Sequence, residues 1–277
     1  MSVGLFAGCS SDSGDISSDN TDSGGTKDSI VIATSGETPS LSPTEHNAVA
    51  GSYMNMLTYN TLFSSDMDMQ PQPDLAESYE NVDESTWHFK IKEGVKFHNG
   101  ETMTADDVVA SIQWAQGFAE VNLYNSDIVS ITKVDDLTVE IKTDGPDAML
   151  LSNLCHHGNA IVPKSLIDSG HDFNTDPVGT GPYKPVEWKR GDSLTFEAFD
   201  DYFLGAPKIK NMTWKIIPEG SSRTIALEAG KVDFILEVES MDADRLKENS
   251  DITVLQYNDT SLSWLMLNNE APDSESL

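Results

Sequence analysis

The sequence predicts a mixed α/β fold. Short segments with strand periodicity alternate irregularly with segments of helical periodicity, and neither a regular strand–helix–strand order nor an internal repeat is present. With 277 residues, 38% hydrophobic content and five Trp, the chain is long enough to bury a sizeable core. We therefore expect either one large domain or two smaller ones.

The first elements are a strand and a helix. Residues 30–33 (Ile-Val-Ile-Ala) form a β-branched run that is typical of a buried strand. A loop rich in Ser, Gly and Pro follows at 35–43, and residues 49–62 then show helical character. The predicted helical stripe consists of Tyr53, Met56, Leu57 and Asn60.

The central segment predicts a strand followed by a capped helix. Residues 87–92 alternate strictly between apolar and polar, and the pattern continues through Val95 and Phe97 to a turn. A helix is expected after Thr104, because its hydroxyl can cap the first turn and Asp107 stands at the third helical position. The predicted inner face of this helix is Val108, Val109, Ile112 and Ala115.

The later elements alternate in the same irregular way. They are a hairpin of strands 128–134 and 137–141, a short helix through 154, paired strands 183–188 and 193–199, a strand at 212–216, a helix at 221–229 ended by Gly230, and strands at 232–236, 252–256 and 262–267.

The charge excludes several classes of function. The chain has 46 acidic and 17 basic residues, for a net charge of −29. This excess repels phosphate backbones and anionic head groups, so we expect no nucleic-acid partner and no adsorption to acidic lipid. The charge itself is expected to be a solvated surface, with selection of a cationic ligand as the alternative.

The two cysteines differ in setting. They form neither a disulfide framework nor a zinc-binding pattern, and Cys155 is expected to be a buried, inert thiol. The segment 5–11 around Cys9 resembles the lipobox of bacterial lipoproteins, in which the cysteine carries the lipid. This resemblance implies a residual signal at 1–9, a lipid anchor at Cys9 and a disordered Ser/Asp/Gly linker at 10–29. The alternative is an incidental cysteine in a disordered tail.

Three groups of motifs resemble one family. The first comprises 73–79, 87–101 and 104–108; the second comprises 177–183, Trp188 and 201–203; the third is 226–233. In this order they are similar to the extracytoplasmic solute-binding proteins, family 5, of peptide and nickel ABC importers. The resemblance covers residues 30 to 272.

The resemblance implies a periplasmic-binding-protein-like type II fold. Its first lobe would comprise 30–61 and 177–262, with an inserted subdomain at 62–176. Residues 263–277 would contain a crossing strand and the start of a second lobe that is largely absent. The implied protein is a monomer on the outer face of the cytoplasmic membrane, and it hands oligopeptides to a permease with ATPase subunits, without catalysis or cofactor.

Eight residues are candidate ligand contacts, each with a competing structural role. Ser35, Gly36 and Glu37 follow the first strand, where open sheets present ligands, and Glu37 could pair with a peptide amino group. Tyr53 could instead belong to the core, as could Trp264 on the crossing strand. The remaining candidates are His157, Asn159 and Asn268. No metal site is expected, because the adjacent His156 and His157 should point apart.

Two alternative functions stay open. Relatives that bind nickel chelates or other small solutes belong to the same family, and the histidine pair gives the nickel alternative some weight. A serine-type hydrolase is the remote alternative, although the sequence contains no GxSxG, HExxH or CxxC motif.

Overall fold

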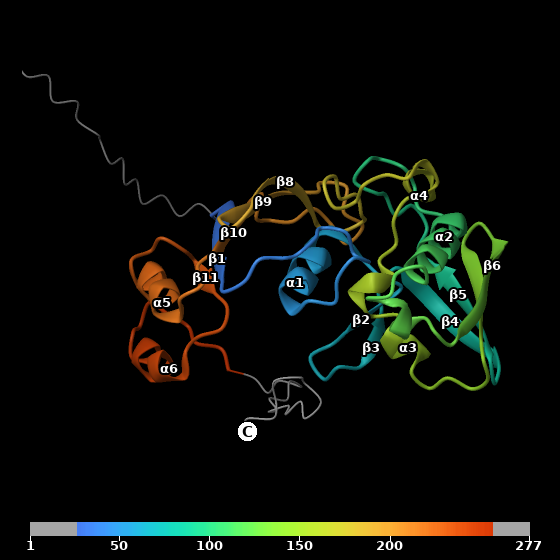
Figure 1. Cartoon of the computed structure of the whole chain (residues 1–277), viewed down its shortest axis with the longest axis horizontal. Helices are drawn as coiled ribbons and strands as arrows, with labels where there is room; N and C mark the ends of the chain where they lie inside the picture. The colour runs from blue at the N-terminus through green and yellow to red at the C-terminus, as the bar shows by residue number, and fades with distance from the viewer. Residues whose placement is uncertain (1–26, 257–277) are drawn as a thin grey trace, which may run out of the picture.

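The structure is a computed structural model that describes residues 27–256. These residues form two larger β-sheets and a two-stranded ribbon (Figure 1). Helix α1 (Val49–Thr58) contacts a strand of the first sheet and a 3-10 turn of the other half of the molecule. The predicted mixed α/β class is therefore confirmed.

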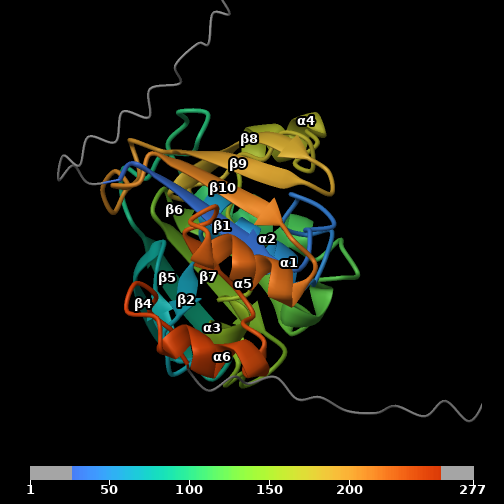
Figure 2. The ribbon, with the colours of Figure 1, turned by 90° about the vertical axis from the view of Figure 1, so that its left-hand side faces the viewer.

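The main sheet has the strand order β11-β1-β10-β9-β8. Its strands are β1 (Ser29–Thr34), β8 (Tyr183–Lys189), β9 (Ser193–Ala198), β10 (Asn211–Ile216) and β11 (Phe234–Ile235). Strand β1 pairs in parallel with β10 and β11, whereas β9 is antiparallel to β10 and β8. Figure 2 shows α5 (Gly220–Glu228) in front of this sheet and α6 (Ser240–Lys247) below it.

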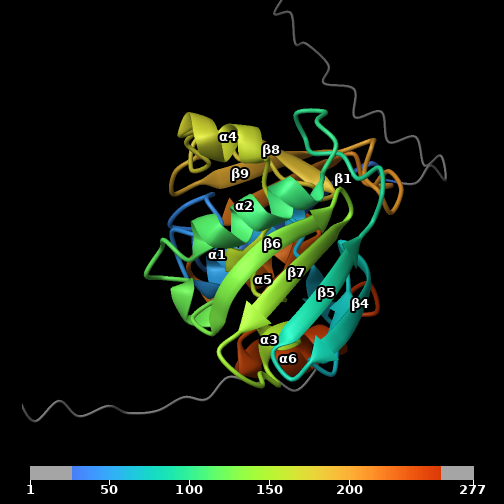
Figure 3. The ribbon, with the colours of Figure 1, turned by 90° about the vertical axis from the view of Figure 1, so that its right-hand side faces the viewer.

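The second sheet is antiparallel throughout, with the order β4-β5-β7-β6. Its strands are β4 (Ala76–Asp83), β5 (Thr86–Ile91), β6 (Ile128–Asp135) and β7 (Thr138–Thr143). Helix α2 (Ala105–Ala115) packs beside β6 and β7 (Figure 3). The smaller elements are β2 (Phe63–Ser65), β3 (Pro71–Pro73), η1 (Asn122–Tyr124), α3 (Leu150–Asn153), η2 (His157–Asn159) and α4 (Lys164–Ser169).

Local sequence signals account for this second half. Phe89 and Ile91 are fully buried, as the alternation predicts, and Trp87 is partly buried against the same core. The predicted helix start is confirmed: the Asp107 carboxylate accepts hydrogen bonds from the Thr104 N–H (2.8 Å) and hydroxyl (3.0 Å). Its other oxygen accepts the N–H of Lys164 at 2.8 Å, which ties α4 to α2. The second sheet lies within residues 62–176, the range of the predicted inserted subdomain. The exact boundaries of the domains stay a prediction.

The two halves are joined where residues 179–181 pass the end of α1. The Gly181 N–H donates to the Thr58 carbonyl (2.9 Å), and the N–H of His98 donates to the Gly179 carbonyl (2.8 Å). The imidazole of His98 also contacts the Gly181 carbonyl at 2.9 Å, and burial lowers the pKa of this ring to about 4. The two backbones approach so closely here that only glycine fits at positions 179 and 181.

The predicted stripe of α1 is wrong in part. The helix ends at Thr58 because Tyr59 takes an extended backbone (φ −127°, ψ 155°). Its buried residues are Gly51, Met54, Asn55 and Thr58, whereas Met56 is 68% exposed. One reason is that Gly51 packs against the ring of His46 and Thr58 against the backbone of 179–181, where small side chains fit best, while Met54 packs into the apolar cluster of the main sheet.

Three predicted strands are also shorter or missing. The predicted strand 232–236 is shortened to β11, which pairs with β1 through two residues before the chain turns at Glu237. The predicted continuation of the strand through 95–97 is reduced to an isolated bridge between Lys96 and Thr102. Residues 252–256 form no strand, since the described residues offer them no partner. The ribbon β2–β3 and the elements β4, α4 and α6 were not predicted, and the predicted strand 262–267 lies outside the described residues.

We predict that Gly181→Ala destabilises the fold, because the new Cβ would lie 2.4 Å from the carbonyl carbon of Thr58 and 2.5 Å from the Leu57 oxygen. These are backbone atoms, so relief needs a shift of the main chain, and we expect a loss of about 1–3 kcal/mol in the free energy of unfolding. Gly36→Ala is the matched control, because its Cβ meets Ala50 at an ordinary 3.7 Å. Urea titration of both variants measures the difference, and equal midpoints would contradict the prediction.

Candidate functional site

The carboxyl ends of the three parallel strands meet at one edge of the main sheet. The Ile217 N–H donates to the Thr34 carbonyl (2.9 Å) and the Leu236 N–H donates to the Ala33 carbonyl (3.0 Å), so the ladder extends to the last residues. We call residues 34–37, 216–218 and 236–237 the carboxyl edge. Open α/β sheets bind ligands outside such an edge, which makes it the candidate site.

Glu237 carries an exposed carboxylate on the carboxyl edge. Its side chain is 51% exposed and accepts a hydrogen bond from the Ser35 hydroxyl. Its backbone is left-handed (φ 58°), a conformation that costs more for Glu than for Gly. The sequence pattern did not single out Glu237. Its one sequence signal is its position directly after the predicted strand 232–236, which corresponds to the position of Ser35 after the first strand.

Arg223 holds the strand ends together beneath Glu237. This residue of α5 is 3% exposed, and its guanidinium donates to the carbonyls of Ile217 (2.8 Å), Pro218 (2.8 Å) and Glu237 (3.0 Å). Its Nη2 lies 3.9 Å from the Glu237 carboxylate, too far for a hydrogen bond. The arginine therefore fixes the backbone of the edge and leaves the carboxylate accessible to solvent.

Glu37 contacts the β8–β9 turn. Its Oε1 accepts the indole N–H of Trp188 (2.8 Å) and the N–H of Gly191 (3.0 Å). Gly36 is half-buried beside Ala50. The structure thus brings Ser35, Gly36 and Glu37 to one edge, while the Glu37 carboxylate already stabilises a turn. Ligand contact by these residues stays a prediction.

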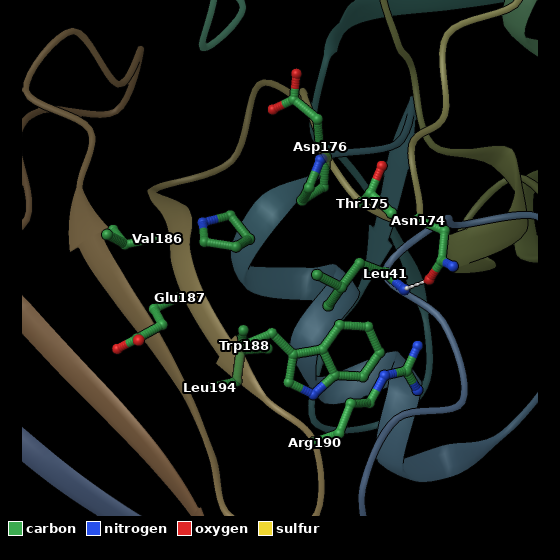
Figure 4. Close-up of a pocket in the computed structure, with 11 residues that line it drawn as sticks. Leu41, Asn174, Thr175, Asp176, Val186, Glu187, Trp188, Arg190 and Leu194 are labelled. Carbon is green, nitrogen blue, oxygen red and sulfur yellow. Dashed lines mark hydrogen bonds between the residues drawn. The ribbon is translucent and has the colours of Figure 1, made fainter.

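A cavity of about 370 Å³ lies beside this turn. The Arg190 guanidinium stacks on the Trp188 ring, with 3.4 Å between the guanidinium carbon and the ring centroid. Figure 4 shows the Trp188 ring next to Leu41, with the carboxylates of Asp176 and Glu187 directed away from it. The lining is mixed: Trp188, leucine, proline and valine side chains supply apolar surface, and Asn174, Thr175, Asp176, Glu187 and Arg190 supply polar groups.

Tyr53 packs against the main sheet. Its half-buried ring stacks on Trp214 of β10, with centroids 6.2 Å apart and planes 20° apart. Both rings belong to the apolar cluster between α1 and the sheet. This packing is the competing core role considered for Tyr53, and contact with a ligand stays a prediction.

A second polar group lies near the start of α1. His46, His157, His156 and Tyr124 form a column of rings that we call the histidine stack. The centroid distances are 5.1 Å from His46 to His157, 4.2 Å from His157 to His156 and 3.6 Å from His156 to Tyr124. The adjacent histidines therefore lie ring to ring, and the expectation that they point apart is wrong.

Burial keeps the histidine stack uncharged. Desolvation, reinforced by the neighbouring imidazoles, lowers the pKa of His156 to about 3, and desolvation also lowers that of His46. Desolvation likewise lowers the pKa of His157 to about 4. The Nε2 of His157 lies 3.2 Å from the His46 carbonyl, which can only accept, so this nitrogen carries the proton.

Asn159 is used within the fold. It is 1% exposed, accepts a hydrogen bond from Asn125 (2.7 Å) and donates to the Asn153 carbonyl (2.9 Å). His157 is also buried, with its Nδ1 3.1 Å from the Ser52 hydroxyl. The structure places both residues in η2, where their side chains contact other parts of the fold, and their predicted ligand contacts stay predictions.

The structure bears on the expectations about metal binding and about Cys155, but it does not describe Cys9 or two of the candidate ligand contacts. Between residues 27 and 256, no group of three His, Cys, Asp or Glu side chains is arranged to hold a metal ion. The same range contains no helix long and apolar enough to cross a membrane. Cys155 is half-buried, and burial raises the pKa of its thiol. Cys9, Trp264 and Asn268 lie outside the described residues.

We predict that the histidine stack makes the fold sensitive to acid. The unfolded chain binds these protons near pH 6.5, whereas the folded chain binds them only near pH 3–4, so stability falls as the pH drops between these values. His156→Gln should reduce the difference between the melting temperatures near neutral pH and at about pH 4.5. Tyr124→Phe keeps a stacked ring and all three imidazoles, so it should retain the wild-type difference. Equal acid sensitivity of His156→Gln and wild type would contradict the prediction.

Comparisons with known proteins identify the family. Residues 70–275 match the model for bacterial extracellular solute-binding proteins, family 5 Middle. The glutathione-binding protein GsiB of Pectobacterium atrosepticum is 31% identical over 232 residues, which are 81% of this chain and 45% of that protein.

Solved structures agree with this match. The oligopeptide-binding protein AppA of Bacillus subtilis, in complex with a nonapeptide, has a TM-score of 0.70 and 29% identity over 78% of this chain and 45% of that chain. NikZ of Campylobacter jejuni, in complex with Ni(L-His), has a TM-score of 0.73 and 26% identity over 81% and 46% of the two chains. This chain thus spans about half the length of the relatives it matches. The expected periplasmic-binding-protein-like type II fold is confirmed as a partial domain, and the chain belongs to the bacterial extracellular solute-binding proteins, family 5.

Proposed function

We propose that this chain supplies one lobe of an extracytoplasmic receptor that binds oligopeptides and passes them to an ABC permease. The observation that carries the proposal is the family match over 70–275, together with the polar carboxyl edge where such a sheet presents ligands. GsiB is named for glutathione, itself a short peptide, and AppA was solved with a nonapeptide. A peptide offers an amino group and regularly spaced amides, which carboxylate, hydroxyl and backbone groups can bind.

The proposal includes no chemical reaction. Ser52 and His157 form a serine–histidine contact of 3.1 Å, but the serine hydroxyl is also 3.2 Å from the Ala48 carbonyl. The other nitrogen of His157 faces a backbone carbonyl where a catalytic triad would place a carboxylate. With a pKa of about 4, this imidazole is also a poor general base at neutral pH. These contacts favour binding over hydrolysis.

A nickel chelate is the second candidate solute. The three imidazoles of the histidine stack have lowered pKa values and are uncharged at neutral pH, and a metal would have to displace the backbone N–H groups that the Nδ1 atoms of His46 and His156 accept at 3.3 and 3.0 Å. A metal that already carries chelating ligands needs few more from the protein. NikZ, which was solved with Ni(L-His), supports this alternative.

The remaining parts of the proposal concern the membrane. A lipid at Cys9 and the linker 10–29 would hold the receptor at the outer face of the cytoplasmic membrane, next to permease and ATPase subunits. The net charge of −29 supports a soluble monomer without nucleic-acid partners.

Calorimetric titration tests the proposed function. We expect the peptide Ser-Thr-Ser-Ala and glutathione to bind, and we expect chromatography of the mixtures afterwards to recover both intact. Binding of Ni(L-His)₂ alone would favour the nickel chelate instead, and His156→Gln should then weaken it while Tyr124→Phe should not. Cleavage of either peptide, or no binding of any probe, would contradict the proposal.

A further inference from the structure

We infer that Met67 and Met69, at the tip of the β2–β3 ribbon, form a binding site for a soft monovalent cation such as Cu(I). The inference is independent of the proposed function, because these residues belong to the two-stranded ribbon and the carboxyl edge belongs to the main sheet. Three observations carry it: the exposure of both thioethers, the turn that holds them, and the hydrogen bonds that already occupy the oxygen atoms around them.

The two methionines at the tip are exposed together. Met67 is 87% exposed and Met69 is 57% exposed. Their Cα atoms lie no more than about 7 Å apart along the chain, so two flexible thioether side chains can reach one ion. Met241 of α6, by contrast, is 86% exposed but has no other methionine near it in the sequence. The ribbon tip therefore offers a pair of sulfur donors where α6 offers one.

The turn holds Met69 in a conformation that suits glycine better. The Met69 N–H donates to the Asp66 carbonyl (3.0 Å), and the Asp66 N–H donates to the Gln70 carbonyl (3.0 Å), which closes a three-residue hairpin loop. The last residue of such a loop is left-handed and is usually glycine, and here Met69 takes that position with φ 60°. A side chain that faces solvent adds little packing to offset this strain, so packing does not account for a methionine here.

Hydrogen bonds within the tip determine the class of ion. One oxygen of the Asp66 carboxylate accepts the N–H groups of Asp68 and Gln70 (both 2.9 Å), and the other accepts the side-chain amide of Gln72 (3.0 Å). The Asp68 carbonyl accepts the side-chain amide of Gln70 (3.1 Å). A hard cation such as Ca²⁺ needs about six to eight oxygen ligands, which this tip does not offer. The two thioether sulfurs remain, and soft sulfur ligands select Cu(I) over hard cations.

The surroundings of the pair favour a positive ion. Asp66 and Asp68 flank Met67, and residues 63–73 contain neither Lys nor Arg. A cation that approaches the tip therefore meets no local repulsion. Once one sulfur holds the ion, the second is present at a high effective concentration, which a single exposed methionine does not provide.

The test is a titration of the whole chain with Ag(I), a soft monovalent cation that air does not oxidise, in a chloride-free buffer. Cys9 and Cys155 are first replaced by serine, because thiolates would compete for the ion. The carbon NMR signals of the methionine methyl groups report each thioether separately. We expect the Met67 and Met69 signals to shift with one midpoint, at an Ag(I) concentration roughly tenfold or more below that for Met241.

Two variants distinguish a chelate from independent exposed thioethers. Met69→Leu keeps the size of the side chain but removes its sulfur, so the Met67 midpoint should rise roughly tenfold, to the value for Met241. Met241→Leu is the matched control and should leave the Met67 midpoint unchanged. Equal midpoints for Met67 and Met241 in the parent chain, or an unchanged Met67 midpoint in Met69→Leu, would overturn the inference.

A third variant separates the site from the fold. Met69→Gly removes the thioether and relieves the left-handed backbone, so it should raise the Met67 midpoint for Ag(I) without lowering the urea midpoint of unfolding. A lower urea midpoint would show that the fold itself requires this methionine, which contradicts the inference.

Discussion

The fold depends on the close passage of two backbones, at the end of α1 and at residues 179–181. Cβ atoms at Gly179 or Gly181 would fall within 2.5 Å of the α1 backbone or of Tyr59. The hydrogen bond from Gly181 to Thr58, with those between His98 and this segment, connects α1, the turn before α2 and the start of β8. Because β8 is an edge strand of the main sheet, this passage positions that sheet relative to the second one.

The passage also affects what α1 can bury. A helix that packs against bare backbone at one end and the His46 ring at the other has little room for large side chains. On that side the helix buries Gly51, Asn55 and Thr58, whereas its large buried side chain, Met54, packs into the apolar cluster of the main sheet and Met56 is exposed. The histidines near the start of α1 fill the remaining space, and their lowered pKa values are the electrostatic consequence of that burial.

Features set by a few consecutive residues could be predicted from the sequence. The cap of α2 by Thr104 and Asp107 and the inward alternation of Phe89 and Ile91 are of this kind. For the candidate site, the sequence predicted the location at the end of the first strand but not the contacts that its side chains make. The partner of Glu37, Trp188, is 151 residues away, and no local pattern indicates that they meet. The left-handed backbone of Glu237 and its contact with Arg223 become visible only in three dimensions.

The net charge of −29 does not by itself specify a ligand. Many acidic side chains face solvent, and several pair with lysines, as Glu77 does with Lys90 and Asp201 with Lys96. At physiological ionic strength their field decays over about 8 Å, so most of them act on a distant solute only weakly. Such a field can speed the approach of a cation but cannot distinguish one amino group from another. Selection of a ligand needs groups at fixed positions, and at the end of β11 Arg223 and Ser35 hold the backbone and the side chain of Glu237 in this way.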